Sequence, residues 1–291
     1  MKYSMHRRFI EKKSILNNVD TIGLNIDSYT SNIYHDLLYI PSTTNKLIIF
    51  NTIDKSIREI QLPSNIARST SQIWNDKLYM PANIGTRLEI FDLINETYRY
   101  ITIPNATRNT SEIWNNKLYL PERGGQNLLI FDLVNEKVRT IPLGVNLYRH
   151  QSQIWKDKLY MPANSGTRLE IFDLVNESYR YITIPNRSRD SSLIRNNKLY
   201  LPQHNGNVYE IFDLISETLR TIPVSTLSRN TCFEHNNKLY IPNSNTPTLE
   251  IFDFNTESIE IINLPNTTYR YNSLVHKNKA YINSSILEIL S

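Results

Sequence analysis

The stretch SEIWNNKLYLPERGGQNLLIFDLVNEKVRTIPL, residues 111–143, contains four short apolar segments separated by polar residues. The segments 111–114, 117–121, 127–133 and 137–143, named strands a to d, are rich in Ile, Leu, Tyr and Phe, which favour β-structure. The spacers contain Asn, Asp, Gly and Pro, which are typical of turns. No window of the stretch has the apolar period of a helix, so it predicts four antiparallel strands joined by hairpins.

The same pattern returns along the whole chain. The tyrosine of strand b recurs every 40 or 41 residues, at Tyr39, Tyr79, Tyr119, Tyr160, Tyr200, Tyr240 and Tyr281. A four-stranded unit of about 40 residues is typical of a β-propeller blade, whereas helical solenoids require amphipathic helices. The sequence therefore predicts an all-β protein, a seven-bladed β-propeller of four-stranded antiparallel blades over residues 14–291.

The two ends of the chain complement each other. The last copy ends after its strand c, at residues 286–290, and has no strand d. An additional segment at residues 18–24 precedes the first copy, and its VDTIGL aligns with the VRTIPL of residues 138–143. If this N-terminal strand 18–24 completes the C-terminal blade, the ring is closed and strand c has no exposed edge. Residues 1–13 then form a short basic N-terminal extension.

Composition limits the compartment and the class of partner. The chain has a single cysteine, Cys232, which excludes a disulfide framework and favours a reducing compartment. It contains neither the apolar run of a signal peptide nor the ~20 apolar residues of a membrane span. We therefore expect a cytoplasmic monomer without membrane association. The abundance of Asn and Ile is typical of an AT-rich genome, such as those of some large DNA viruses or protists. The net charge of +4 does not by itself indicate nucleic acid.

The repeats resemble those of kelch-like propellers. The residues that carry the resemblance are Arg108 before strand a, the Leu-Tyr pair at 118–119 and the Phe-Asp pair at 131–132, with counterparts in most copies. Two kelch features are largely missing, because the double glycine occurs only at 124–125 and the tryptophan near strand d is absent. The resemblance implies a protein-interaction scaffold that binds its partner through the face carrying the d–a and b–c loops.

Arginines recur in those loops. In six copies, one lies eleven residues before the tyrosine of strand b, in the d–a loop: Arg68, Arg108, Arg149, Arg189, Arg229 and Arg270. The b–c loops add Arg87, Arg123 and Arg168. Facing solvent, these side chains would form a positive rim around the mouth of the central channel, suited to carboxylates and phosphates. A residue repeated in most blades also suits a structural role, in which each arginine bridges to backbone carbonyls or an Asp of the neighbouring blade.

Positions that break the repeat indicate where one sector of the rim differs from the others. His150, Asp190 and Tyr271 follow directly after three of these arginines and vary between copies. In a closed ring His150, Asp190 and Glu122 could converge at the channel mouth. At the opposite end of strand a, three copies have a tryptophan and the others have Tyr, Arg or His: Trp74, Trp114, Trp155, Tyr34, Arg195, His235 and His276.

These patterns predict a non-catalytic propeller that binds an acidic or phosphorylated protein segment through the arginine-rimmed face. Two alternatives remain open: an enzyme, either a lyase or a hydrolase, with its site at the mouth of the central channel, and a binder of polyanions or nucleic acid. The sequence has no nucleophile–base motif, metal-ligand spacing or phosphate-binding loop, so we predict no catalytic residue, metal or cofactor. The arginines also lack interleaved exposed aromatic residues, which disfavours base stacking.

Overall fold

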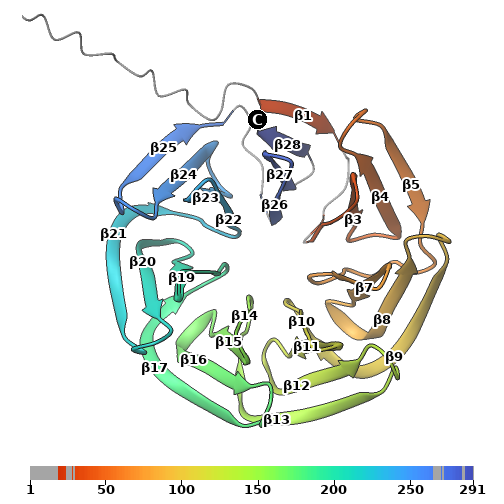
Figure 1. The fold of residues 1–291 in the computed structure, drawn as a ribbon, viewed down its shortest axis with the longest axis horizontal. Helices are drawn as coiled ribbons and strands as arrows, with labels where there is room; N and C mark the ends of the chain where they lie inside the picture. The colour runs from red at the N-terminus through yellow and green to blue at the C-terminus, as the bar shows by residue number, and fades with distance from the viewer. Residues whose placement is uncertain are drawn as a thin grey trace, which may run out of the picture.

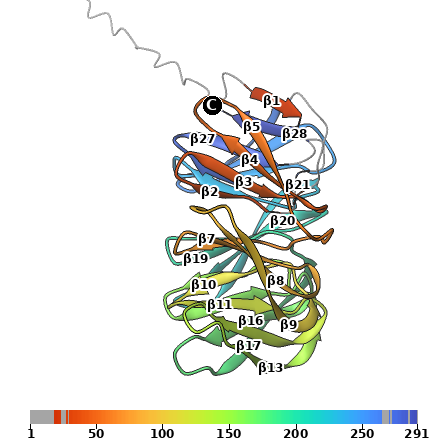
Figure 2. The ribbon, with the colours of Figure 1, turned by 90° about the vertical axis from the view of Figure 1, so that its right-hand side faces the viewer.

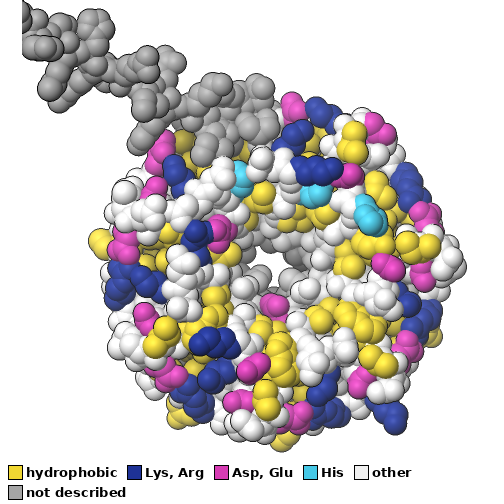
Figure 3. All heavy atoms as spheres, in the orientation of Figure 1, with side chains coloured by type: hydrophobic (Ala, Val, Ile, Leu, Met, Phe, Trp, Pro, Cys, Tyr) yellow, Lys and Arg dark blue, Asp and Glu magenta, His cyan; other side chains and the backbone are white. Residues whose placement is uncertain are grey.

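The computed structural model describes residues 19–23, 28, 30–264, 270, 272–283 and 286–290. Its strands form seven four-stranded antiparallel sheets arranged in a ring, and the described residues contain no helix (Figure 1). From the side the ring is a disc (Figure 2). The innermost strands surround a central channel, visible as the hollow in Figure 3. The prediction of a seven-bladed β-propeller is confirmed.

Each blade contains strands a to d in chain order, from the channel outward. Blade 1 consists of β2 (Asn32–Tyr34), β3 (Leu37–Pro41), β4 (Lys46–Asn51) and β5 (Ile57–Gln61), and blade 2 of β6 (Gln72–Trp74), β7 (Lys77–Pro81), β8 (Ile84–Asp92) and β9 (Tyr98–Thr107). Blade 3 consists of β10 (Glu112–Trp114), β11 (Lys117–Pro121), β12 (Gly125–Asp132) and β13 (Val138–Leu147), and blade 4 of β14 (Gln153–Trp155), β15 (Lys158–Pro162), β16 (Ser165–Asp173) and β17 (Tyr179–Ser188). Blade 5 consists of β18 (Leu193–Arg195), β19 (Lys198–Pro202), β20 (Gly206–Asp213) and β21 (Leu219–Leu227), and blade 6 of β22 (Phe233–His235), β23 (Lys238–Pro242), β24 (Thr248–Asp253) and β25 (Ile259–Asn263).

Blade 7 is built from both ends of the chain. Its strands are β26 (Asn272–His276), β27 (Lys279–Asn283), β28 (Ile286–Leu290) and, outermost, β1 (Val19–Gly23). β1 pairs antiparallel with β28 along its whole length, and its Ile22 packs against the apolar cluster that contains Leu287 and Ile289. The predicted closing strand is confirmed for residues 19–23. Residues 18 and 24, and the predicted extension 1–13, lie outside the described residues.

The repeated NNKLYLP segment explains how blades turn and pack. Asn115 and Asn116 have φ angles of 45° and 57°, a left-handed turn that Asn tolerates well and that suits a two-residue hairpin between β10 and β11. Side chains alternate along β11. Leu118 and Leu120 therefore join an apolar cluster with blade 2, while Tyr119 joins a cluster with blade 4. The same short strand thus binds each blade to both of its neighbours.

Ion pairs join the outer strands of neighbouring blades. Arg139 on β13 donates from Nη1 to Glu177 Oε2 in the c–d turn of blade 4, at 2.6 Å. Four further pairs repeat this contact: Arg58–Glu96, Arg99–Glu136, Arg180–Glu217 and Arg220–Glu257. At the ring closure the charges are reversed, because Asp20 of β1 accepts from Lys55 Nζ at 2.7 Å. Basic and acidic side chains are accordingly interspersed around the ring in Figure 3.

Candidate functional site

The six arginines of the d–a loops do not face solvent. Each side chain is buried, with at most 1% of the residue surface exposed: Arg68, Arg108, Arg149, Arg189, Arg229 and Arg270. The prediction that they form a solvent-facing positive rim is therefore wrong. Their contacts agree with the alternative, in which each arginine has a structural role between neighbouring blades.

Arg149 shows how such an arginine is held. Its Nε and Nη2 donate to the two carboxylate oxygens of Glu170 on β16, the second bond at 2.8 Å. Its Nη1 donates to the carbonyls of Glu122 and Gly125, at 3.0 and 2.7 Å, in the b–c loop of blade 3. One guanidinium therefore joins two blades, and its charge is neutralised by a buried carboxylate.

The partner carboxylate is present in most blades but not in all. Five arginines have one on strand c: Arg68–Glu89, Arg149–Glu170, Arg189–Glu210, Arg229–Glu250 and Arg270–Glu288. Blade 1 has Ser28 and Ile48 at the two positions, so both charges are missing. Blade 3 keeps Arg108 but has Leu129 in place of the glutamate. Burial lowers the pKa of Arg108 to about 10, and its Nε has no hydrogen-bond partner among the described residues.

Two of the three b–c loop arginines lie on strand c. Arg87 stacks on Tyr100 at 4.5 Å from the ring centroid, and Arg168 stacks on Tyr181 at 4.0 Å. Both tyrosines are about half exposed. The prediction that the arginines lack exposed aromatic neighbours is therefore wrong for Arg87 and Arg168. Neither arginine lines the cavity described next.

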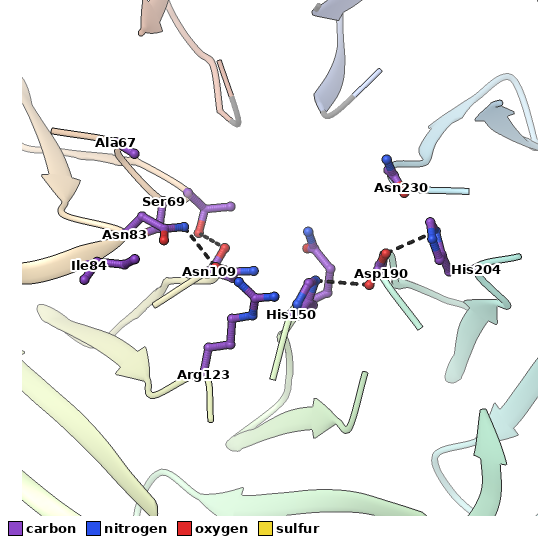
Figure 4. A pocket seen from close by; sticks show the side chains of 12 residues that line it. Ala67, Ser69, Asn83, Ile84, Asn109, Arg123, His150, Asp190, His204 and Asn230 are labelled. Carbon is purple, nitrogen blue, oxygen red and sulfur yellow. Dashed lines mark hydrogen bonds and ion pairs between the residues drawn. The ribbon is translucent and has the colours of Figure 1, made fainter. Parts of the chain in front are cut away.

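The d–a and b–c loops of blades 2 to 6 enclose a cavity of about 540 Å³ at the channel mouth (Figure 4). Two sets of residues recur around it. The first set directly follows the buried arginines: Ser69, Asn109, His150, Asp190 and Asn230. The second set lies two residues after the proline of strand b: Asn83, Arg123 and His204. The cavity lining is thus made of the positions at which the blades differ.

The two sets are paired across blade boundaries. Asn83 of blade 2 donates from Nδ2 to Asn109 Oδ1 of blade 3 at 3.0 Å. Asn164, at the corresponding position of blade 4, donates to the Asp190 carboxylate of blade 5. The repeat places Arg123 of blade 3 next to His150 of blade 4 in the same way, and Figure 4 shows both side chains projecting into the cavity.

Asp190 lies in ion-pair contact with two histidines. His150 Nδ1 lies 3.0 Å from Asp190 Oδ1, and His204 Nδ1 lies 3.1 Å from Asp190 Oδ2 (Figure 4). A carboxylate oxygen only accepts, so a neutral ring in this contact carries its proton on Nδ1. The Nδ1 atom of His204 also lies 3.3 Å from the Arg229 carbonyl, a second acceptor. In His204, the Nε2 atom lies 2.9 Å from the Asn205 amide nitrogen, which donates to it. In His150, Nε2 has no hydrogen-bond partner among the described residues, and the ring lines the cavity.

Arg123 is the cation of the cavity. No carboxylate of the described part of the chain pairs with its guanidinium, which lies 5.7 Å from the Tyr148 ring centroid. Its Nε atom and the Oδ1 atom of Asn230 are shielded from solvent and have no hydrogen-bond partner among the described residues. Buried polar atoms in proteins normally have a hydrogen-bond partner, so these two atoms distinguish this lining.

The structure thus brings together three of the predicted site residues, Arg123, His150 and Asp190. Tyr271 lies outside the described residues. Glu122 does not join them, because its carboxylate accepts from the backbone and side-chain amides of Asn127 at 3.1 and 2.9 Å. Sequence reasoning missed His204. The signal for it was its position two residues after the strand-b proline, where Asn83 and Arg123 stand in other copies.

The variable ends of strand a have a structural role in four blades. Trp74 Nε1 donates to Asn116 Oδ1 in the a–b turn of the next blade at 3.2 Å. Three other copies contact the equivalent turn residue with a different side chain: Tyr34 to Asp76, Arg195 to Asn237 and His276 to Asp36. Cys232 also has no reactive character, because burial raises its pKa to about 12.

Glu112 on β10 is a partly buried carboxyl on an innermost strand. At the same position, Asn32 and Gln72 donate from their side-chain amides to the carbonyl of a serine in the next blade, at 3.2 and 2.7 Å. An ionised carboxylate has no proton to donate there. Burial raises the pKa of Glu112 to about 8.

Replacing Glu112 by glutamine is expected to remove a pH dependence of stability. The unfolded carboxyl ionises near pH 4.5 and the folded one near pH 8. Between these values the native state binds more protons, so the stability of the wild type falls as pH rises from about 4.5 to 8. At pH 8.5 Glu112→Gln should be more stable by about 2 kcal/mol, allowing for partial exposure. Urea unfolding at pH 5 and pH 8.5 measures this, and equal differences at both values would contradict it.

Among the described residues, no three His, Cys, Asp or Glu side chains are grouped so that they could hold a metal ion. Within the same residues, no helix is long and apolar enough to cross a membrane.

Comparisons with known proteins identify the fold. No family model and no curated protein matches the sequence. The virginiamycin B lyase of Staphylococcus aureus has a similar structure, with a TM-score of 0.83 and 13% identity over 94% of this chain and 99% of that chain. A catalytically inactive histidine-to-alanine variant of that lyase, solved with quinupristin, matches with a TM-score of 0.83 and 14% identity over 94% and 99%. The extracellular domain of a B. thetaiotaomicron protein described as a hybrid two-component system has a TM-score of 0.78 and 15% identity, over 94% of this chain and 39% of that one. At these identities the likeness shows a shared propeller fold.

Proposed function

We propose that the channel-mouth cavity binds a small ligand carrying a carboxylate or phosphate group, with Arg123 as its cationic contact. The observation that carries this proposal is the Arg123 guanidinium, which lines the cavity without a carboxylate partner among the described residues. Guanidinium presents a planar fork of donors that matches both anions. The volume of about 540 Å³ is in the usual range for small-molecule sites.

The proposed site is smaller than the arginine-rimmed face predicted from the sequence. Of the predicted arginines, Arg123 alone lines the cavity, so an acidic or phosphorylated segment of a partner protein would also have to reach it there. Binding of a polyanion, a kelch-type scaffold role, the monomeric state and the cytoplasmic location stay predictions.

An enzyme with its site at the channel mouth is the second candidate. The contact between His150 Nδ1 and Asp190 Oδ1, at 3.0 Å, favours it, because a neighbouring carboxylate orients an imidazole for proton transfer. The similar fold of a lyase that is inactive as a histidine-to-alanine variant supports it by analogy only.

Replacing Arg123 by alanine is expected to weaken binding of an anionic probe by about 10- to 100-fold, the usual range for losing charge-assisted hydrogen bonds. Isothermal titration of the full chain with succinate and with inorganic phosphate measures this. Arg87→Ala is the matched control, because Arg87 stacks on Tyr100 and does not line the cavity. Unchanged affinity in the folded Arg123→Ala variant would exclude the site. A steep loss of heparin binding with salt, insensitive to Arg123, would instead indicate a polyanion surface.

A further inference from the structure

We infer that the cavity is catalytic, with His150 as the general base for hydrolysis of an ester whose anionic group is bound by Arg123. The inference rests on the proposed function, since it takes Arg123 as the contact that positions the substrate. Its own basis is the contact of His150 with Asp190, which places the proton of the neutral ring on Nδ1, and the position of His150 in the cavity lining.

The tautomer of His150 is set by Asp190. Oδ1 of the carboxylate lies 3.0 Å from Nδ1, so in the neutral ring the proton is on Nδ1 and the lone pair on Nε2, which has no partner among the described residues. Asn164 donates to the same oxygen of Asp190, and His204 contacts the other oxygen while also lying 3.3 Å from the Arg229 carbonyl. Asp190 is therefore a fixed positioning residue, and His150 presents a basic nitrogen to the cavity.

Water is the nucleophile that this lining allows. The Ser69 hydroxyl donates to the Pro81 carbonyl at 3.3 Å, and the Thr70 hydroxyl donates to the Asn109 carbonyl at 3.4 Å. Neither lies within an assigned hydrogen bond of His150, so the pairing needed to activate a hydroxyl is missing among the described residues. His150 lines the cavity at the channel mouth, so water that enters the cavity can reach Nε2.

The step balances without a further reagent. His150 Nε2 takes a proton from water, and the hydroxide adds to the acyl carbon of the ester. The side-chain amides of Gln151 and Asn230 line the cavity and can donate to the carbonyl oxygen as it becomes negative. The bond between the acyl carbon and the alcohol oxygen then breaks. The leaving alkoxide takes the proton from the imidazolium, so an acid and an alcohol are released and His150 is neutral again.

The test uses the full chain with two chromogenic probes, the anionic 4-nitrophenyl hemisuccinate and the neutral 4-nitrophenyl acetate. His150→Ala is expected to lower kcat for the hemisuccinate by about 100-fold or more. Added imidazole should restore part of that rate, above the rate of imidazole with the probe alone, which a purely structural role of His150 would not permit. His235→Ala, at the other end of a strand a, is the control and should hydrolyse both probes like the wild type. Arg123→Ala should raise KM for the hemisuccinate far more than KM for the acetate, which has no anionic group.

The outcomes separate the two proposals. If folded His150→Ala hydrolyses the hemisuccinate like the wild type, or if imidazole gives no rescue, the catalytic inference is wrong, whatever succinate binding shows. If succinate binding depends on Arg123 while the wild type gives no hydrolysis above buffer, the binding site stands and the inference again falls. If neither binding nor KM responds to Arg123→Ala, the proposed function itself fails. Thermal unfolding of each variant confirms that it is folded.

Discussion

Replacing Glu170 by glutamine is expected to lower the free energy of unfolding by about 3–5 kcal/mol, the usual cost of removing one member of a buried ion pair. Glu170 and its partner Arg149 are both fully buried. The glutamine has nearly the same shape but no charge, so the guanidinium would be left in the interior without its counter-ion. The variant also weakens the acceptor of the Tyr179 hydroxyl, which donates to Glu170 Oε1 at 2.7 Å.

Urea unfolding of wild type and variant at neutral pH measures the effect. Glu177→Gln is the matched control, because Glu177 pairs with Arg139 at the outer rim, where the two side chains are 34% and 44% exposed. Exposed pairs contribute about 0–1 kcal/mol, so this control should change stability little. Equal losses in the two variants would show that the buried pairs do not hold the blades together as inferred.

The fold was predictable because its signals are local. Segments 111–114 and 117–121 are joined by two asparagines that favour a left-handed turn, and this unit returns at a fixed spacing. The closing strand was visible because the missing strand d and the additional N-terminal segment have the same pattern. Neither inference needed knowledge of where any side chain points.

Burial of the arginines was not predictable from the loop positions alone. Arg149 stands in a loop, and loops are normally solvated. Its partner Glu170 lies on strand c, 21 positions later, so the pair appears only when strand c is compared between blades. Blade 1 has Ser28 at the arginine position and Ile48 at the glutamate position, so it lacks both charges. Their joint absence indicates that the two residues form a pair in the other blades.

The candidate site was predictable where it breaks the repeat. His150 and Asp190 stood out because they follow a repeated arginine. His204 did not stand out, because no single residue predominates at its position, where Asn occurs in two blades and other residues in the rest. Its role depends on the contact between neighbouring blades, which only the ring brings together.

Blade 3 permits a direct test of this arrangement, because Leu129 occupies the glutamate position and Arg108 has no carboxylate partner among the described residues. Introducing a carboxylate there supplies the missing partner. Leu129→Glu gives up roughly 2–3 kcal/mol of apolar burial. The introduced carboxylate stabilises the fold by a similar amount, because it pairs with the buried Arg108 guanidinium and accepts from its Nε. We expect its unfolding free energy to stay within about 1 kcal/mol of the wild type, because charge pairing and apolar packing in such sites nearly balance.

The same substitution in blade 1 should have the opposite result. Ile48→Glu buries a carboxylate at the equivalent position, where Ser28 replaces the arginine and no cation compensates it. An unpaired buried charge is among the most destabilising changes, so a loss of about 3–5 kcal/mol is expected. Urea unfolding of both variants supplies the comparison, and the difference between them isolates the contribution of the arginine. Similar losses in both blades would mean that Arg108 does not accept a carboxylate partner. The burial of these arginines would then be set by their carbonyl contacts alone.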